Sequence, residues 1–428
     1  MTLIKGTVIQ FTDGTTGVVV AKFGEGGQGE VYKIEYKGET SVLKWYRKRP
    51  SQDFINNLKR NAASPSPFSC FLWPKAVTDT GLGVGYVMDF AGQGSKEFSK
   101  FLINATHWQT EEALISAAIN LCIAYQKLHL RGLAYFDLND GNFFFNPNDG
   151  KVYIGDNDNV SAASFNVSNI GGKQGYMAPE IYLGNSPNRY SDYFSLAIIL
   201  FRMIFVDHPF HGKYMEKAAC LTQGIIRYIY GENPVFIFDP LDKSNAASNE
   251  FSPNALKRWG AVPGFVRDAF IKAFSKESVK DPQKRMIESE WIKILLKWRA
   301  ALCKCPVCNK LTYIEPQDKG VCKECRKSYS AFWMQIGKGE YIPLVSGQIV
   351  YTAQLGLDSK LDKVAEIVSS MIDKKKLGIR NVSSFDWMVT YEGQHKVIKP
   401  GESFRLCDDM SIRFSNMAEA RIKLVNPL

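Results

Sequence analysis

Two aspartates and an asparagine stand at fixed intervals between residues 137 and 156, and this spacing constrains the chain more than any other feature. Asn142 follows Asp137 after four intervening residues, and Asp156 comes after thirteen more. A stretch rich in Asp and Asn most often forms a turn. Here each aspartate follows an apolar stretch, which places it at the end of a predicted strand. Other motifs along the chain must therefore decide between a turn and a reactive centre.

A glycine-rich segment lies near the N-terminus between two predicted strands. Gly24, Gly26 and Gly29 follow the G-x-G-x-x-G spacing, with Val31 two positions later. Glycines allow backbone amides to approach phosphate oxygens without obstruction by side chains. Because glycine turns between strands are common, this segment alone is a weak signal. The next strand ends at Lys44, and this pairing of glycine loop and lysine favours phosphate binding over a solvated lysine.

Three further motifs continue the series in order. They are Ala178-Pro179-Glu180, Asp192 at the start of a helical stretch, and Arg285 near the end of the helical region. With the glycine loop, the lysine and the acids, they form an ordered set over residues 20–290 that resembles the eukaryotic-like protein kinases. The resemblance implies a two-lobed protein kinase fold, in which these last three motifs are structural.

The resemblance assigns a chemical role to each residue of the reactive centre. Asp137 would accept the proton of the attacking hydroxyl, and Asn142 and Asp156 would hold Mg²⁺. Lys44 would bind the α- and β-phosphates of ATP. Phosphoryl transfer needs mainly positioning and charge neutralisation, so two metal ligands, a base and a lysine form a minimal set.

The segment 85–91 resembles the hinge that joins the two lobes of a kinase. Met88 would be the gatekeeper, and backbone groups of Asp89 and Ala91 would bind adenine. Gly24, Gly26, Gly29 and Val31 would cover the nucleotide from the other side. Taken without the resemblance, the same segment fits an ordinary core strand equally well.

The sequence departs from the kinase pattern around the catalytic aspartate. Tyr135 and Phe136 replace the histidine and arginine of H-R-D, and that arginine normally binds a phosphorylated activation loop, so activation by loop phosphorylation is not expected. Asn139 stands where Ser/Thr kinases usually have lysine, and Lys173 where they usually have threonine. This paired change suggests that Lys173 reaches Asp137 from the activation segment. A solvated lysine on a loop is an equally good interpretation.

The helix expected after Lys44 offers this lysine no evident acidic partner. Residues 51–60 contain a single acid, Asp53, which lies too early, while Asn56 or Asn57 could bind the lysine only without charge. The alternative to an active kinase is therefore a nucleotide-binding pseudokinase scaffold. A kinase of small molecules is disfavoured, because the A-P-E segment and the helix at Asp192 support a peptide-docking lobe.

Five of the nine cysteines cluster between residues 303 and 325. Four of them form two C-x2-C pairs separated by thirteen residues: Cys305, Cys308, Cys322 and Cys325. Two such turns present four thiolates to a tetrahedral zinc ion, and four protein ligands leave no open position, which indicates a structural zinc ribbon. Since basic residues here lack interleaved aromatics, protein docking is favoured over nucleic acid binding.

Several less common features narrow the resemblance further. These are Trp73-Pro74, the strand 83–88, the D-N-D-N-V run at 156–160 and the cysteine ribbon behind the kinase core. They resemble the bacterial kinases of TerY–phosphatase–kinase triads, which are encoded beside a von Willebrand A-type protein and a metal-dependent phosphatase. The resemblance implies phosphorylation of Ser or Thr in a protein partner, with those two proteins as candidate partners.

The chain is thus expected to be an α+β protein with four parts. Residues 1–90 form the kinase N-lobe, 91–301 the C-lobe, 302–335 the zinc ribbon and 341–428 a small β-rich domain. The last part resembles the second half of a forkhead-associated β-sandwich, through Leu377–Asn381, Trp387, Pro400-Gly401 and Ile412–Phe414. The arginine and Ser-x-x-His elements with which that family binds phosphothreonine are not found, so an interaction domain that does not recognise phosphate is expected.

Composition bears on the cellular environment. The 428 residues carry a formal net charge of +10 without a long Lys/Arg run, which indicates a solvated surface more than a nucleic acid partner. The N-terminus lacks a signal-peptide pattern, and the apolar stretch around 194–206 is too short to span a bilayer. A cytoplasmic protein without membrane attachment is expected.

Overall fold

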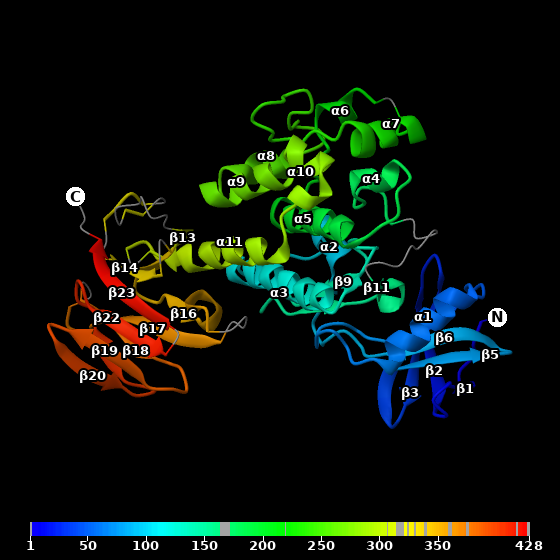
Figure 1. The fold of residues 1–428 in the computed structure, drawn as a ribbon, viewed down its shortest axis with the longest axis horizontal. Coiled ribbons are helices and arrows are strands. Elements are labelled where there is room, and N and C mark those ends of the chain that lie inside the picture. Colours follow the sequence, from blue (N-terminus) through cyan, green and yellow to red (C-terminus); the bar gives the residue numbers. More distant parts are fainter. Residues whose placement is uncertain are drawn as a thin grey trace. The chain divides into compact units, whose positions relative to one another are not determined.

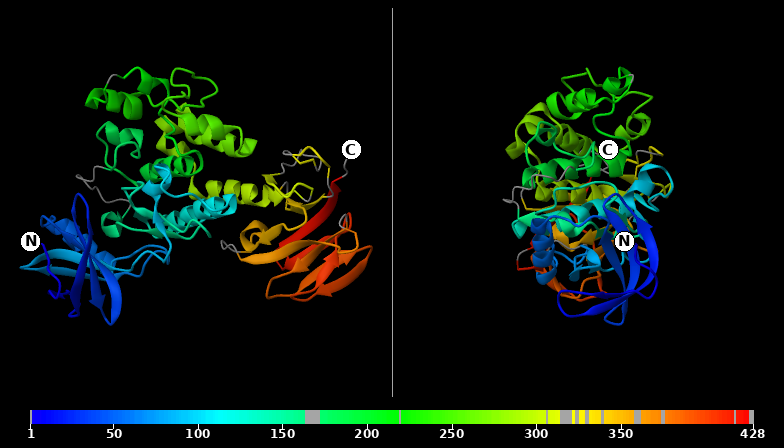
Figure 2. Two further views of the ribbon diagram at one scale, coloured as in Figure 1. Left: turned by 180° about the vertical axis from the view of Figure 1, so that it is seen from behind. Right: turned by 90° about the vertical axis from the view of Figure 1, so that its right-hand side faces the viewer.

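The computed structural model describes residues 2–162, 172–218, 220–305, 307–313, 321–322, 325–328, 331–337, 340–357, 362–373, 376–416 and 418–425. The chain divides into two compact units. The first comprises Met1–Ala261 and Arg267–Trp291, and the second comprises Val262–Val266 and Ile292–Leu428. Figure 1 and Figure 2 show the course of the chain through both units.

The first unit begins with a six-stranded antiparallel sheet in the order β1-β2-β3-β4-β6-β5. Tyr32, Ile34 and Tyr36 of β3 are buried at every second position, because successive side chains of a strand point to opposite faces. The strands are β1 (Val8–Gln10), β2 (Thr16–Glu25), β3 (Gly29–Tyr36), β4 (Glu39–Tyr46), β5 (Ala76–Thr80) and β6 (Gly83–Met88). This sheet is the predicted N-lobe.

A helix, α1 (Gln52–Ala63), packs on this sheet. Ser51 caps its N-terminus, where the hydroxyl accepts a hydrogen bond from the Phe54 backbone N–H at 3.3 Å. Ile55 and Leu58 join a core cluster with strand residues of the sheet. Two asparagines on α1 are also buried, and their partners become important at the active site.

Helices dominate the rest of the first unit, as predicted for a C-lobe (Figure 1). The two central ones are α3 (Glu111–Leu130), capped by Thr110, and α5 (Arg189–Phe205), which starts in a capping box at Asn188. Both are largely buried. The others are α2 (Phe98–Leu102), α4 (Pro179–Tyr182), α6 (Lys213–Glu216), α7 (Gln223–Arg227), α8 (Pro253–Trp259), α9 (Gly264–Ala273), α10 (Lys276–Lys280) and α11 (Glu288–Ala301), of which α9 and α11 extend into the second unit.

Short strands between α2 and α4 position the reactive residues. Asn142 immediately precedes β9, and Asp156 follows β10 after one residue, so an antiparallel hairpin brings the two together. These strands are β7 (Lys96–Glu97), β8 (Leu133–Ala134), β9 (Phe143–Phe145), β10 (Val152–Ile154) and β11 (Ser161–Ala162). The hairpin explains why the spacing between the two acids and the asparagine is informative.

Among the described residues, α3 alone has the length and apolar composition of a membrane-spanning helix. Most of its apolar window, 78%, is buried inside the protein. The longest apolar stretch of the sequence, 194–206, lies in α5 except for its last residue, and most of α5 is also buried. Both helices therefore have the character of core helices.

The second unit contains a small hairpin and a β-sandwich. The hairpin pairs β12 (Leu302–Lys304) with β13 (Leu311–Tyr313). One sheet of the sandwich has the order β15-β14-β23-β22-β19-β20, and the other has β16-β17-β18-β21. Their strands are β14 (Ala331–Ile336), β15 (Glu340–Leu344), β16 (Ile349–Tyr351), β17 (Lys363–Ser369), β18 (Leu377–Asn381), β19 (Trp387–Tyr391), β20 (Gln394–Ile398), β21 (Ser403–Arg405), β22 (Ser411–Ser415) and β23 (Ala418–Val425).

The sandwich starts earlier in the chain than its predicted bound of 341. Strand β14 lies in the range assigned to the zinc ribbon, yet it pairs with β23, with Met334 opposite Ile422. Both side chains are fully buried in the core that the two sheets share. In the sequence, no turn signal separates residues 331–336 from the cysteines, so the boundary between ribbon and sandwich could not be recognised there. The strand belongs to the sandwich because it pairs with a strand almost ninety residues later.

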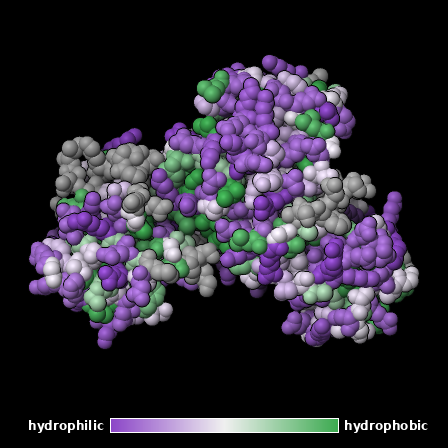
Figure 3. Space-filling view, viewed as in Figure 1, coloured by the Kyte–Doolittle hydropathy of each residue, from purple (hydrophilic) through white to green (hydrophobic). Residues whose placement is uncertain are grey.

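The surface seen in Figure 3 is mostly hydrophilic, and apolar side chains gather there in small groups. This agrees with the formal net charge of +10 and the charged fraction of 22%. The visible face thus presents mainly polar and charged groups to partners.

Candidate active site

The glycine loop closes the hairpin between β2 and β3. A Cβ atom on Gly29 would lie 2.2 Å from the Trp45 carbonyl oxygen, so packing against β4 requires glycine there. A Cβ on Gly24 or Gly26 would meet nothing within 4 Å. Since the protein itself does not require these two glycines, their open side suits the close approach of a ligand.

Lys44 lies on β4 with its side chain 8% exposed. Its ammonium donates to Asp156 Oδ1 at 2.7 Å, to Asp158 Oδ2 at 2.8 Å and to Gln28 Oε1 of the glycine loop at 3.3 Å. Burial alone would lower the pKa of Lys44, but the carboxylates of Asp158 and Asp156 outweigh it and raise the pKa. The lysine therefore stays positively charged.

Asp137 is half-buried in the loop between β8 and β9. Its Oδ1 accepts hydrogen bonds from Asn139 Nδ2 at 3.0 Å and from the Lys173 backbone N–H at 3.3 Å. Burial raises the pKa of Asp137 to about 6, although these hydrogen bonds oppose the shift. A carboxylate with such a pKa accepts a proton more readily than an exposed aspartate does.

The backbone of this loop is held from below by α5. Asp192 accepts hydrogen bonds from the backbone N–H groups of Tyr135 at 2.7 Å and Phe136 at 3.0 Å. Phe136 has a φ of 69°, a left-handed conformation that a bulky residue adopts only when its surroundings enforce it. The Tyr135 hydroxyl donates to the carbonyl of Gly155, next to Asp156. Tyr135 and Phe136 thus support the loop although they depart from H-R-D.

Asn142 and Asp156 have oxygens that could hold a metal ion. The Asn142 amide donates to the Asp137 carbonyl at 2.9 Å, which leaves its own oxygen as an acceptor. Asp156 uses Oδ1 for Lys44, and its side chain is 37% exposed. Its φ of 48° and ψ of 46° are left-handed, and the buried Asn157 fixes this turn by donating to the carbonyls of Leu72 and Ile154. A carboxylate and an amide oxygen fit the ligand preference of Mg²⁺.

Lys173 differs from its predicted contact. Its ammonium pairs with Asp140, while only its backbone N–H reaches Asp137. The Asp137 carboxylate already accepts a hydrogen bond from Asn139. The buried Asp140 instead gains a countercharge from the lysine. The ammonium of Lys173 thus lies beside this loop without touching Asp137.

The predicted hinge residues line an apolar cluster between the lobes. Met88 is buried there, and Val31, Ala91 and Phe144 are partly buried against the same cluster. Asp89 turns its carboxylate to Lys75, which leaves its backbone for other contacts. The sequence prediction did not include Phe144 in this apolar cluster. Phe144 lies on β9, the strand that directly follows Asn142.

Phe23 and Phe90 add a second contact that the sequence prediction missed. Their rings meet edge to face, with centroids 5.7 Å apart, next to the glycine loop and in the hinge. Phe23 is nevertheless 68% exposed. This exposed aromatic ring places an apolar surface beside the glycine loop.

The α1 helix does not bind Lys44. The amides of Asn57 and Asn61 each donate to the Val160 carbonyl at 2.8 Å, and Asn56 instead accepts from Gln52 on the exposed side. The prediction that Asn56 or Asn57 bonds the lysine is therefore wrong. The acid that the sequence prediction missed is Asp158, whose side chain is fully buried.

The structural motifs pair as expected. Arg285 binds Glu180 through two hydrogen bonds, at 2.7 and 2.6 Å, and also the Tyr190 carbonyl at 2.9 Å. Such a bidentate pair between an Arg and a carboxylate is stronger and more specific than a single contact. It ties the A-P-E segment to the end of the C-lobe.

A six-stranded sheet followed by a helical region, with Lys44, Asp137, Asn142 and Asp156 brought together, is the arrangement of a protein kinase. The protein kinase domain family matches residues 18–290, more than half of the chain, and the chain belongs to that family. It is 24% identical over 254 residues to protein kinase C-like 2 of Schizosaccharomyces pombe and 24% over 298 residues to protein kinase C-like 1 of Caenorhabditis elegans. It is 29% identical over 163 residues to the cAMP-dependent protein kinase catalytic subunit of S. pombe.

These matches cover 57%, 62% and 38% of this chain, respectively. They cover only 23%, 39% and 31% of the three relatives. The chain therefore spans well under half of the length of these curated relatives. What is shared is the kinase domain.

In the second unit, the predicted zinc ligands lie together. The Sγ atoms of the four cysteines are all within 4.8 Å of one another, with Cys305 to Cys325 and Cys308 to Cys322 at 3.9 Å. A tetrahedron of sulfurs with Zn–S bonds of about 2.3 Å has edges of about 3.8 Å. The donor set therefore fits Zn²⁺.

The two cysteine turns share one backbone design. The N–H of Cys308 donates to Cys305 Sγ at 3.5 Å, and that of Cys325 donates to Cys322 Sγ at 3.4 Å. Asn309 and Arg326, which follow the pairs, have φ angles of 58° and 60°. N–H donors stabilise thiolates, so both turns are prepared for a cation.

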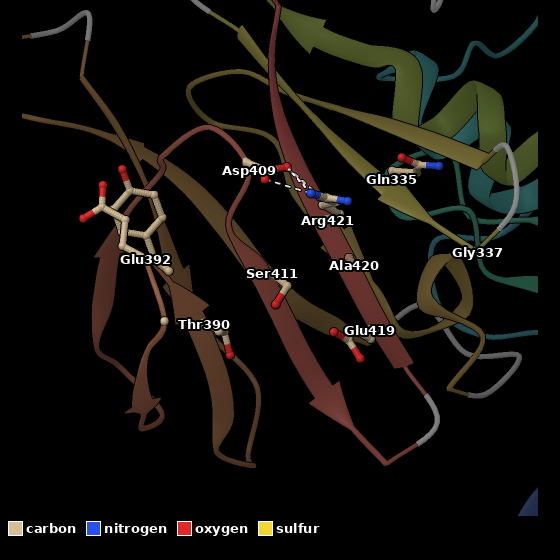
Figure 4. Close-up of a pocket in the computed structure, with 11 residues that line it drawn as sticks. Gln335, Gly337, Thr390, Glu392, Asp409, Ser411, Glu419, Ala420 and Arg421 are labelled. Atoms are coloured by element: carbon tan, nitrogen blue, oxygen red, sulfur yellow. Dashed lines mark hydrogen bonds and ion pairs between the residues drawn. The ribbon is translucent and has the colours of Figure 1, made fainter.

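A polar pocket of about 620 Å³ lies on the six-stranded sheet of the sandwich (Figure 4). Arg421 on its wall is held by both carboxylate oxygens of Asp409, at 2.6 and 2.7 Å. Thr390 of β19 and Ser411 of β22 also line the pocket.

Proposed function

We propose that this chain is an active Ser/Thr protein kinase that transfers the γ-phosphate of ATP to a hydroxyl of a protein partner. The observation that carries the proposal is that Lys44, Asp137, Asn142 and Asp156 lie in one cluster with charges suited to the reaction. The buried Asp192 supports it by fixing the backbone of the catalytic loop.

Each residue has a distinct task in this mechanism. Lys44 binds the α- and β-phosphates, and Asp137 accepts the proton of the attacking hydroxyl. Asn142 and Asp156 would hold Mg²⁺, which when bound would neutralise the charge that develops on the phosphate oxygens. Backbone groups of Asp89 and Ala91 bind adenine beneath the glycine loop.

The choice of acceptor is supported by the relatives. They are named protein kinases C-like and cAMP-dependent protein kinase, at 24–29% identity. The ordered A-P-E segment, tied by Arg285, provides a floor for a peptide. Serine and threonine are therefore the proposed acceptors.

The second candidate function is a nucleotide-binding scaffold without transfer. The lack of an acidic residue for Lys44 on α1 favours it, since kinases normally need that pair. The pairing of Lys44 with Asp158 weakens this objection. A scaffold also gives no reason for the raised pKa of Asp137.

The second unit is proposed to recruit partners. The zinc ribbon and a forkhead-associated-like sandwich that does not bind phosphate would dock proteins, and the candidates are a von Willebrand A-type protein and a metal-dependent phosphatase. A structural Zn²⁺ with four thiolates suits a reducing compartment, in line with a cytoplasmic location. No contact of this chain with nucleic acid or membrane is proposed.

The test of the proposed function compares wild type with Asp137→Ala in the presence of γ-labelled ATP and Mg²⁺. Transfer to the chain itself or to an added partner, lost in the variant, supports the kinase. Nucleotide binding of equal strength in both proteins shows that the variant is folded. Binding by the wild type without any transfer would favour the scaffold.

A further inference from the structure

Asp158 is a second acid at Lys44, and it differs from Asp156 in its surroundings. Its side chain is fully buried, whereas that of Asp156 is 37% exposed. Asp158 Oδ2 accepts from Lys44 at 2.8 Å and from the Tyr46 hydroxyl. Burial and the Asp158 carboxylate raise the pKa of Tyr46, so this hydroxyl remains a donor. A buried carboxylate is stable only with a countercharge and hydrogen bonds, and Lys44 and Tyr46 supply both.

The geometry suits Asp156 and Asp158 to different tasks. Asp156 has an exposed face and a backbone turn that point to metal binding. When its charge is shared with a cation, Asp156 attracts Lys44 less strongly. Asp158 is fully buried and has no such exposed face, so a cation at Asp156 does not compete with Lys44 for Asp158.

The α1 helix is attached to the same segment without an ion pair. Asn57 and Asn61 both donate to the Val160 carbonyl, two residues after Asp158. In protein kinases an αC glutamate pairs with this lysine, and the position of that helix controls the pair. Here the segment 156–160 holds both the lysine and the helix.

From these contacts we propose that Asp158 is the positioning residue that orients Lys44 toward the nucleotide phosphates, in place of the glutamate of the helix. Tyr46 keeps the Asp158 carboxylate in position. The inference rests on the proposed function for its effect on turnover, while its effect on phosphate binding stands apart from that function. One consequence is that a movement of α1 does not by itself break the lysine pair.

The experiment uses the full zinc-loaded chain as wild type, Asp158→Asn, Tyr46→Phe and the control Asp53→Asn. Asp53 is an exposed acid on α1, so its change is chemically matched but away from the lysine. Calorimetry measures the affinity for Mg²⁺–ATP and for adenosine, which lacks phosphates. Steady-state assays with a peptide acceptor measure kcat and KM.

We expect Asp158→Asn to lower kcat/KM by roughly 100-fold and to weaken ATP binding about tenfold, because a buried charge loses its partner. Adenosine affinity stays within about twofold of wild type, because the apolar cleft is intact. Tyr46→Phe shifts both quantities in the same direction by a smaller factor, and Asp53→Asn behaves as wild type.

The proposal is overturned if Asp158→Asn matches Asp53→Asn, or if adenosine and ATP binding fall equally, which would give Asp158 a packing role only. If Asp158→Asn does not fold, the ratio of ATP to adenosine affinity in Tyr46→Phe decides by the same criterion. Failure of the wild type to transfer phosphate contradicts the proposed function, and the affinity ratio still tests the lysine pair.

Discussion

The two units of this chain bury different kinds of polar group. In the kinase unit, buried side chains include charged ones, among them Lys44, Asp158, Asp192 and Arg285. Among the described residues after 301, and apart from the cysteines of the zinc site, the buried polar side chains are all neutral: Thr312, Gln348, Thr352, Gln354 and Asn381. Burying a charge is costly unless it is paired and hydrogen-bonded. The difference indicates that the first unit holds the buried charges suited to chemistry, whereas the second unit is the one proposed to dock partners.

The largest expected effect is the removal of zinc from the second unit. Cys322→Ser is expected to lose the metal and unfold the ribbon, because zinc binding supplies roughly 10–16 kcal/mol of apparent folding free energy in such small modules. Elemental analysis should find one zinc per wild-type chain. Cys407→Ser, at a cysteine outside the quartet, keeps it. Zinc retained by Cys322→Ser would contradict the four-thiolate site.

The next effect concerns a buried charge of the kinase unit. Asp192→Asn should lower the free energy of unfolding by about 3–5 kcal/mol, because the buried pair with His129 loses its charge. Urea unfolding measures this loss. Asp242→Asn, in an exposed loop, is the control with little effect. Equal losses in both variants would remove the special role of the buried charge.

The same cluster makes stability depend on pH. Burial alone would lower the pKa of His129, but its bonds to Asp192 and Glu288 raise it to about 9, above 6.5 for the unfolded chain. The folded state thus holds a proton that the unfolded state releases, which stabilises it by about 3 kcal/mol below pH 6.5. This contribution is lost as pH rises through 9.

Unfolding of the kinase unit in urea between pH 6 and 9.5 checks this dependence. His129→Gln should abolish most of the decline between pH 6.5 and 9. A decline of the same size in the variant would show that another group is responsible.

A neutral buried group should matter less than a charged one. Asn381 donates to the carbonyls of Phe385 at 2.8 Å and Ile398 at 3.0 Å. Asn381→Ala is expected to cost about 1–3 kcal/mol, because two carbonyls lose their partner. Thermal unfolding of the sandwich checks the value, with the exposed Ser403→Ala as control. A loss larger than that of Asp192→Asn would reverse the comparison between the units.

The smallest effect is expected at Lys173. Its side chain is 51% exposed and pairs with Asp140, and such pairs contribute about 0.2–1 kcal/mol. Lys173→Ala should therefore change turnover less than about threefold, as measured with saturating ATP. A loss above tenfold would show that the ammonium acts in the reaction after all.

The sequence predicted those residues of the site that belong to short motifs with a regular spacing. Lys44, Asp137, Asn142 and Asp156 follow spacings that a β-hairpin and a helix impose, and the structure brings these residues together, while their catalytic and metal-binding roles stay predictions. The four cysteines were equally predictable, because each pair is a local turn. Local geometry is what a motif records.

Contacts between distant segments were not predictable. Asp158 stands where the familiar motif has glycine, and its partnership with Lys44 spans 114 residues. The pairing of Lys173 with Asp140 and that of β14 with β23 also join segments that lie far apart in the sequence. Each contact forms because the tertiary structure pairs a buried charge or buries an apolar strand. A short sequence motif holds no information about such contacts.

The most direct test of the account uses an arrayed peptide library with Ser, Thr or Tyr as acceptor. Wild type and Asp137→Asn are incubated with γ-labelled ATP and Mg²⁺, and ATP affinity is measured for both. We predict label on Ser and Thr peptides with the wild type, and a loss on the order of 10³-fold in the variant at unchanged ATP affinity. Equal labelling by both proteins, or ATP binding without labelling by the wild type, would contradict the account.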